Sequence, residues 1–201
     1  MKCNVQEQEG RIRPDGTEKV TGALKYLTDL SFPNMLYGKV LRSPHPHAKI
    51  LSINTEKAEQ LAGVKAVLTY KNVHGLNRFG IVFPDQPVLC GERVRYVGDA
   101  VVAVAAETIE IAQQALQYIE VEYELLPVLD SPHKALQPDA IQLHPEGNIL
   151  HQTSYKNGHV EEAFTQCASI VEETSELPRQ MHPDKKTEGG VIIAEEEGTI
   201  T

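Results

Sequence analysis

Hydrophobic and polar positions alternate along several short stretches in the first two thirds of the chain. Alternation over about five residues, rich in β-branched side chains, predicts a β-strand. The clearest case is 120–125, which reads Glu-Val-Glu-Tyr-Glu-Leu and predicts a half-exposed strand. The strands predicted in this part are Leu36–Leu41, Lys49–Ile53, Val64–Tyr70, Val94–Val97, Ala100–Ala106 and Glu120–Leu125. Ala100–Ala106 is continuously apolar, which predicts burial on both faces.

Two other stretches repeat their apolar residues at the helical period. Thr55 is placed to cap a short helix that Gly63 ends, and Thr108 is placed to cap a longer one. The apolar stripe of the longer helix consists of Ile109, Ala112, Ala115, Leu116 and Ile119. Strands mixed with two helices predict one α+β domain over residues 19–130, after an extended polar lead-in over 1–18.

A proline-marked stretch follows, and we interpret residues 131–147 as a linker. Beyond it, 148–201 predicts the incomplete start of a second domain. Strands are expected at 149–155 and 169–177, with a helix that begins after Asn157-Gly158 and carries Cys167 on a buried apolar stripe. Glu195 to Gly198 is expected to be a turn.

The last residues also carry information. After that turn the chain ends Thr199-Ile200-Thr201, which reads as a strand that has just begun. From this pattern we expect a fragment, or a truncated product, of a longer subunit.

Composition and charge exclude several classes of partner. The net charge is −9, and no block of Lys or Arg occurs, which argues against nucleic acid and anionic membranes. The three cysteines, Cys3, Cys90 and Cys167, form no Cys-x-x-Cys pair, so a reducing compartment is the default. No secretory signal and no apolar run of membrane-spanning length is present. A cytoplasmic location is therefore expected.

The candidate catalytic and metal-binding residues have structural interpretations that we favour. His45 and His47 at i and i+2 can share one face of a strand, but no Cys, Asp or Glu lies within five residues to complete a metal site. The carboxylates of Asp85, Glu92 and Asp99 stand beside turn residues, where they usually accept backbone N–H groups. We predict no catalytic, cofactor-binding or metal-binding residue in this chain.

Other polar features have weaker functional interpretations. Arg42, Arg93 and Arg95 are candidates for docking a partner, although an internal ion pair is the favoured interpretation. Positive charge near Cys90 would favour a reactive thiolate, but a half-buried structural cysteine is favoured. Gly189-Gly190 does not match a phosphate-binding loop and predicts a turn or bulge.

Four longer blocks occur in a characteristic order. They are Lys19-Val-Thr-Gly22, Arg42-Ser-Pro-His-Pro-His-Ala48, Pro84 to Glu107 with its core Gly91-Glu-Arg-Val-Arg-Tyr-Val-Gly-Asp99, and Ile119-Glu-Val-Glu-Tyr-Glu-Leu-Leu-Pro127. Together they resemble the start of the molybdenum-binding subunit of xanthine dehydrogenases, in the xanthine dehydrogenase/aldehyde oxidase family of molybdenum hydroxylases. The resemblance runs from about Gly10 to the last residue.

The resemblance implies a fold and a function. The expected fold is an α/β-hammerhead domain followed by the first strands of a molybdenum-cofactor-binding domain. The expected parent enzyme oxidises xanthine or hypoxanthine in purine catabolism at a molybdenum–pterin centre, and passes electrons through iron–sulfur clusters and FAD, held by partner subunits, to NAD. The chain alone is expected to be inactive, because the family's pterin-binding and catalytic segments lie downstream.

One stretch departs from the family pattern, and two alternatives to the main interpretation stay open. Pro183-Asp-Lys-Lys186 replaces small, aromatic, Met and Glu residues just before Thr187-Glu-Gly-Gly190, and we expect an exposed loop there. The alternatives are a free-standing hammerhead-type interaction module without a cofactor, and the aldehyde oxidoreductase branch of the family.

Overall fold

The computed structural model describes residues 13–81, 83–178, 180–181, 189–195 and 200. It divides the chain into two units: one is Asn34–Cys167, and the other combines Met1–Pro33 with Ala168–Thr201. Among the described residues, every multi-residue strand lies in the unit 34–167. That unit also contains the candidate site.

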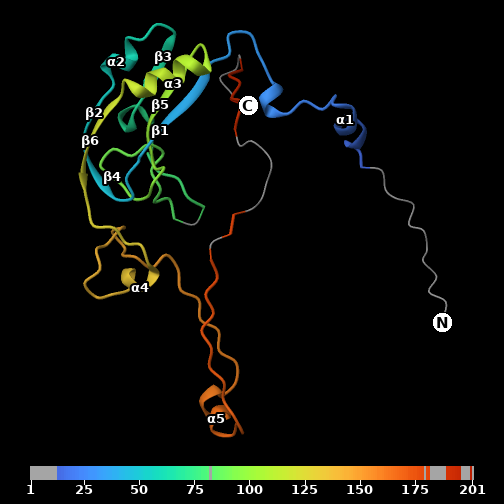
Figure 1. Cartoon of the computed structure of the whole chain (residues 1–201), viewed down its shortest axis with the longest axis vertical. Coiled ribbons are helices and arrows are strands. Elements are labelled where there is room, and N and C mark those ends of the chain that lie inside the picture. Colours follow the sequence, from blue (N-terminus) through green and yellow to red (C-terminus); the bar gives the residue numbers. More distant parts are fainter. Residues whose placement is uncertain (1–12, 82, 179, 182–188, 196–199, 201) are drawn as a thin grey trace, which may run out of the picture. The chain divides into compact units, whose positions relative to one another are not determined.

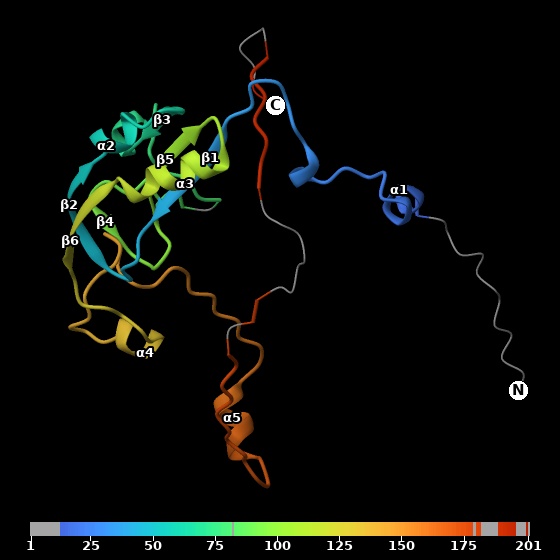
Figure 2. The same cartoon turned by 45° about the horizontal axis from the view of Figure 1, so that its top comes forward.

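Six strands of the unit 34–167 form two three-stranded antiparallel sheets (Figures 1 and 2). The strand order is β1-β5-β3 in one sheet and β4-β2-β6 in the other. Their bounds are β1 Tyr37–Arg42, β2 Ala48–Asn54, β3 Val64–Leu68, β4 Arg93–Val94, β5 Ala100–Ala106 and β6 Glu120–Leu125. The predicted α+β class is confirmed, but β4 is shorter than predicted because the chain bends at Tyr96 and turns through Val97 and Gly98.

Strand β5 forms the centre of the core, as its apolar sequence predicts. It pairs with β1 on one side and with β3 on the other. Val101 and Val102 point to opposite faces, and both are fully buried. Helix α3 (Ile109–Gln117) covers β1 and β5 with its buried alanines, Ala112 and Ala115 (Figure 2).

Of the two predicted helix caps, the structure contains one. The Thr108 hydroxyl accepts a hydrogen bond from the Ile111 N–H at 3.2 Å and begins α3, as predicted. Thr55 precedes α2 (Glu56–Glu59), but its hydroxyl donates to the Glu59 carboxylate at 2.6 Å and caps no backbone group. The prediction that Gly63 ends α2 is also wrong: α2 ends earlier, and Gly63, with φ 88°, turns the chain into β3.

The predicted linker 131–147 contains folded structure. Helix α4 (Pro132–Ala135) lies inside it. The Asn148 amide then closes a loop, because its Nδ2 donates to the carbonyls of Ala135 and Ile141 at 3.0 Å and its Oδ1 accepts from the Leu143 N–H at 2.9 Å. The domain boundaries remain a prediction, but this segment has a defined shape within the unit 34–167.

Three expectations for the later chain are wrong. Residues 149–155 and 169–177 are extended and exposed, and neither forms a strand in the described structure. A strand needs a neighbour for its N–H and C=O groups, and neither segment has a ladder partner among the described residues. Cys167 is exposed, because α5 (Val160–Thr165) has no buried residue and no element of the described structure covers its apolar stripe.

The other unit is described only in part. Helix α1 (Gly16–Thr21) occupies the end of the predicted lead-in 1–18, so that segment is not wholly extended. Gly22, with φ 73°, ends α1 and donates to the carbonyls of Glu18 and Lys19. A Cβ on Gly189 would approach the Leu27 Cδ2 to 2.7 Å, so a larger residue there would require the Leu27 side chain to shift. The predicted loop 183–186 and most of the turn 195–198 lie outside the described residues.

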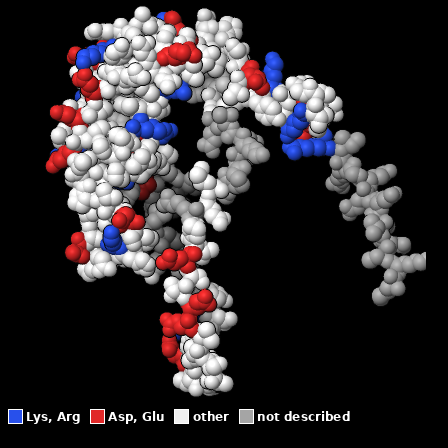
Figure 3. Space-filling view, in the orientation of Figure 1, with Lys and Arg blue, Asp and Glu red and all other residues white. Residues whose placement is uncertain are grey.

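Acidic side chains dominate part of the surface of the unit 34–167. Glu120, Glu122 and Glu124 are exposed along β6, at the edge where Figure 3 shows a row of acidic side chains. In the described part of the chain, no helix has the length and apolar character needed to cross a membrane.

Candidate functional site

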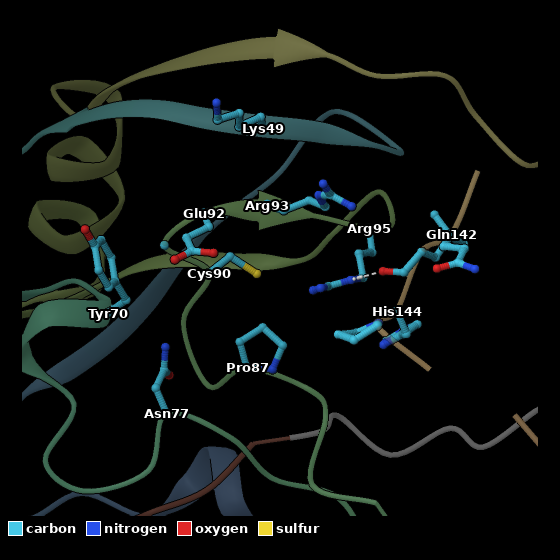
Figure 4. Close-up of a pocket in the computed structure, with 13 residues that line it drawn as sticks. Lys49, Tyr70, Asn77, Pro87, Cys90, Glu92, Arg93, Arg95, Gln142 and His144 are labelled. Atoms are coloured by element: carbon cyan, nitrogen blue, oxygen red, sulfur yellow. Dashed lines mark hydrogen bonds between the residues drawn. The ribbon is translucent and has the colours of Figure 1, made fainter. Parts of the chain in front are cut away.

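A cavity of about 560 Å³ opens in the unit 34–167 beside β2 and β4 (Figure 4). The loop through Asn77 and Pro87 forms one wall, and residues 142–145 form another. The lining residues are Lys49, Tyr70, Asn77, Pro87, Cys90, Gly91, Glu92, Arg93, Arg95, Gln142, Leu143, His144 and Pro145. A volume of this order lies within the usual range of small-molecule sites.

Local contacts fix the wall formed by residues 70–91. The Asn77 side chain donates to the Leu89 carbonyl at 2.7 Å and accepts from the Leu89 N–H at 3.1 Å. The Tyr70 ring lies against Gly91, where a Cβ would come within 2.4 to 2.6 Å of three ring carbons. Gly91 is therefore required for the ring to occupy this position, and Tyr70 gives the cavity an aromatic side.

Two contacts hold residues 142–145 at the opposite wall. The Arg95 Nε donates to the Leu143 carbonyl at 2.8 Å, the hydrogen bond drawn in Figure 4. The His144 Nδ1 lies 3.4 Å from an Asp85 carboxylate oxygen, a pair that is ionic only when the imidazole is protonated. Arg95 and His144 also line a second cavity, of about 340 Å³, which includes Asp85 and Asp99. The segment 142–145 is thus bound to the domain through side chains far from it in sequence.

Cys90 is an unreactive structural residue in this geometry. Its side chain is 1% exposed. Burial, then the charge of Asp99 and a hydrogen bond with it, raise the pKa of the Cys90 thiol to about 12, and the smaller effect of Arg95 opposes them. The thiol therefore stays neutral at ordinary pH, which supports the structural interpretation.

The three candidate carboxylates do not lie together in one site. Asp99 is 3% exposed, and its carboxylate accepts the Arg95 N–H at 3.0 Å, as predicted for a turn residue. Asp85 faces His144 instead of a backbone donor. The Glu92 side chain is exposed at the cavity and has no ion pair or hydrogen bond within the described structure.

The three candidate docking arginines have different surroundings. The Arg42 Nη1 donates to the Gly98 carbonyl at 2.8 Å, and Arg95 donates to Leu143. Both bonds are internal but are made to backbone carbonyls, so the favoured interpretation, an ion pair, is wrong for these two. The Arg93 guanidinium has no ion pair or hydrogen bond to any described residue. Partner docking through the three arginines stays a prediction.

His45 and His47 have separate environments. The His45 ring meets the Tyr123 ring edge to face, with 4.9 Å between centroids. His47 is 2% exposed, and its Nδ1 donates to the Pro127 carbonyl at 2.6 Å. The His47 Nε2 is buried and has no hydrogen-bond partner among the described residues. The two rings therefore have different structural contacts, and in the part of the chain that the structure describes no three His, Cys, Asp or Glu side chains are grouped to hold a metal.

The cavity itself was not predicted from the sequence. Its lining comes from five separate stretches between Lys49 and Pro145, and no local motif links them. One signal was available: Thr69 and Asn72 form a capping box around the short 3₁₀ helix that presents Tyr70. It predicts a helical turn at that point but not the aromatic wall of a cavity.

The fold and the site define an α+β domain of two antiparallel sheets that carries a ligand-sized cavity at the edge of one sheet. The family model of the aldehyde oxidase and xanthine dehydrogenase a/b hammerhead domain matches residues 21–127. The chain belongs to this family. The resemblance predicted from the four sequence blocks is confirmed, and so is the α/β-hammerhead fold.

Comparison with known proteins gives several relatives. Over 197 residues the chain is 64% identical to a probable xanthine dehydrogenase subunit of Bacillus subtilis (strain 168), covering 98% of this chain and 26% of that protein. It is 40% identical to the nicotinate dehydrogenase large molybdopterin subunit of Eubacterium barkeri, covering 96% and 45%. The solved aldehyde oxidoreductase of Desulfovibrio gigas matches with a TM-score of 0.63 and 36% identity, covering 66% of this chain and 16% of that one. The chain thus spans about a quarter of the length of the Bacillus relative.

Proposed function

We propose that this chain supplies the α/β-hammerhead domain of a molybdenum hydroxylase that oxidises xanthine or hypoxanthine in purine catabolism. The observation that carries the proposal is the 64% identity, over 98% of the chain, to a protein named as a probable xanthine dehydrogenase subunit. The match extends over 197 residues, so it spans the cavity walls and the segment after them. A cytoplasmic location belongs to the same proposal.

The cofactors of the proposed enzyme belong to other parts of the assembly. The parent subunit would hold the molybdenum–pterin cofactor, and partner subunits would hold the iron–sulfur clusters and FAD that pass electrons to NAD. The described residues of this chain do not fit a metal centre of their own, since no three ligating side chains are grouped. We assign no step of the reaction to this chain, and we expect the chain alone to be inactive.

Exposed apolar side chains support a role inside a larger assembly. The loop 76–88 carries Leu76, Phe79, Ile81 and Phe83, each at least half exposed. Isolated exposed apolar residues are ordinary, but several on one loop are typical of an interface. The extended segments 149–155 and 169–177 add unpaired backbone groups. We propose that the rest of the parent subunit covers the loop and pairs with these segments as strands.

Activity measurements test the proposal. The native enzyme that contains this sequence, purified with its partner subunits, is expected to reduce NAD or an electron-accepting dye when xanthine or hypoxanthine is added. The 201-residue chain alone, assayed at the same molar concentration, is the matched control and is expected to give no turnover. Purine oxidation by the isolated chain would overturn the assignment of the chemistry to the rest of the assembly.

The substrate class has one specific alternative. Relatives named as aldehyde oxidoreductases match both in sequence and in structure, each at 36% identity. The same native enzyme is therefore assayed with aldehydes beside the purines. Turnover of aldehydes without purine activity would move the protein to the aldehyde oxidoreductase branch.

The second alternative is a free-standing interaction module without a cofactor. The mass of the native polypeptide in its cell distinguishes it from the main proposal. A polypeptide several times longer than 201 residues supports the hydroxylase. A native polypeptide of this length, found without a molybdenum-containing partner, supports the module.

A further inference from the structure

Two like charges lie opposite each other at the edge of the cavity. Lys49 of β2 and Arg93 of β4 are register partners in the antiparallel pair, and both line the cavity. Like charges at directly opposed positions of a sheet destabilise it. Neither side chain forms an ion pair or a hydrogen bond with any described residue. No ion pair of either side chain offsets this repulsion in the described structure, although Glu124 lies opposite Lys49 on the β6 side.

A third cation faces the same cavity. Arg95 lies two residues after Arg93, and its side chain extends towards Cys90 beneath β4 (Figure 4). Its Nε is engaged by the Leu143 carbonyl, which leaves its two terminal amino groups for another acceptor. A planar guanidinium held at one nitrogen is well oriented to bind an oxyanion.

The acidic groups near the cavity balance these cations only in part. Glu92 is the one carboxylate among the lining residues. Glu124 is the register partner of Lys49 on the β6 side, but it forms no ion pair with Lys49 and does not line the cavity. Asp99 is buried and bonded to the Arg95 N–H. The cavity is therefore lined by three cationic side chains and one carboxylate, although the whole chain has a net charge of −9.

The size and walls of the cavity indicate more than a bare ion. About 560 Å³ exceeds what one phosphate or carboxylate group fills. The Tyr70 ring and Pro87 provide apolar walls, and Tyr70 lies on the side of the cavity away from the two arginines (Figure 4). Gly91 lies against the Tyr70 ring and the Lys71 Nζ lies 5.8 Å from the ring centroid, so a flat group can contact only the part of the ring that lines the cavity.

We propose that this cavity binds a small organic oxyanion, a carboxylate or phosphate group attached to a flat body. The oxyanion contacts Lys49, Arg93 and the terminal nitrogens of Arg95, and the flat body lies against Tyr70 and Pro87. A ligand in this position bridges the β2–β4 edge and residues 142–145, which form the opposite wall. Binding therefore also holds that segment against the domain.

Calorimetry and NMR titration of the purified 201-residue chain test the proposal, at fixed ionic strength. The probes are adenosine 5′-monophosphate and benzoate, which have both charge and a ring, inorganic phosphate, which has only charge, and adenosine, which has only the ring system. At least one of the two organic anions is expected to bind at millimolar concentration or below, inorganic phosphate more weakly, and adenosine not at all. Bound ligand is expected to slow amide hydrogen exchange in residues 142–145.

Two variants and a control locate the site. Arg93→Gln and Lys49→Gln are each expected to weaken binding about tenfold, because each removes a charged contact. Lys156→Gln removes an equal charge from an exposed position outside the cavity and is expected to leave affinity unchanged. Arg93→Gln is also expected to raise, or leave unchanged, the Tm of the ligand-free chain, because it removes the opposed like charge. Arg95 is left intact because it holds the cavity wall.

Each of the following results would overturn the proposal. The first is no binding of either organic anion at millimolar concentration. The second is equal binding of adenosine, or affinities that Arg93→Gln and Lys49→Gln do not change. The third is a lower Tm for ligand-free Arg93→Gln, which would show that the Arg93 side chain stabilises the sheet. Equal affinity for inorganic phosphate and the organic anions would overturn the assignment of a flat body.

Discussion

Because the Cys90 thiol is buried, the domain is expected to lose stability as the pH becomes alkaline. The ordinary pKa of the group is 9.0, and the folded chain raises it to about 12, chiefly through burial. Between about pH 9 and pH 12 the thiol therefore keeps its proton in the folded state and loses it in the unfolded state. The stabilising contribution is fully present below pH 9 and is lost progressively as the pH rises from about 9 towards 12.

The magnitude follows from these two values. Linkage between proton binding and folding makes the loss at pH 10 roughly 1.4 kcal/mol, and the loss at pH 8 less than about 0.1 kcal/mol. Other groups also titrate in this range: burial raises the pKa values of Tyr96 and Tyr123 as well. A comparison with Cys90→Ala cancels the burial contribution to these tyrosine shifts, while the smaller contribution of Cys90 to both is lost with the thiol.

Urea unfolding of the reduced chain and of Cys90→Ala at pH 8 and pH 10 measures the effect. We expect the stability advantage of the natural chain over the variant to shrink by about 1.4 kcal/mol between the two pH values. Cys167→Ala, at an exposed cysteine, is the matched control and is expected to show no such change. A difference between chain and variant that is equal at both pH values would refute the burial argument.

Thiol labelling gives an independent measurement. In a Cys3→Ser, Cys167→Ser background at pH 8, Cys90 is expected to react about a thousandfold more slowly than in the urea-unfolded chain, because its thiolate is that much rarer. Labelling at equal rates in the folded and unfolded chains would contradict a raised pKa.

Three further predictions concern stability and the cavity wall. Thr108→Ala is expected to lower the free energy of unfolding by about 1 kcal/mol in urea titration, because α3 loses its capping hydrogen bond, and an unchanged value would contradict that role. Val102→Ala is expected to cost about 2–3 kcal/mol, while Val97→Ala, at a residue 63% exposed, costs less than about 0.5; equal costs would refute the assigned core. Arg95→Gln removes the bond to Leu143, so limited proteolysis should cut the segment 142–145 faster, and an unchanged rate would show that the bond does not hold it.

The parts of the fold that the sequence predicts well are those governed by local patterns. β5 and β6 match their predicted bounds, and α3 begins at the Thr108 cap, because burial and capping there follow from neighbouring residues. Residues 149–155 and 169–177 are predicted to be strands but have no ladder partner in the described structure. A strand-like sequence is able to pair, but it forms a strand only when a second segment lies beside it.

The candidate site could be predicted only in part. Asp99 bonds to a turn N–H as its sequence position predicts, and Cys90 is a structural residue. The helical stripe placed Cys167 in a core, but a stripe is buried only when another element covers it. The opposition of Lys49 and Arg93 depends on the register of two strands more than 40 residues apart, which no local pattern reports.

The molybdenum content of the native assembly tests the central claim most directly. The native protein that contains this sequence is purified from its cell through an affinity tag, and metals are measured per polypeptide by mass spectrometry. The account predicts molybdenum in a constant ratio to the polypeptide, together with iron from the partner subunits. A native protein that carries neither metal, and that purifies without partner subunits, would contradict it.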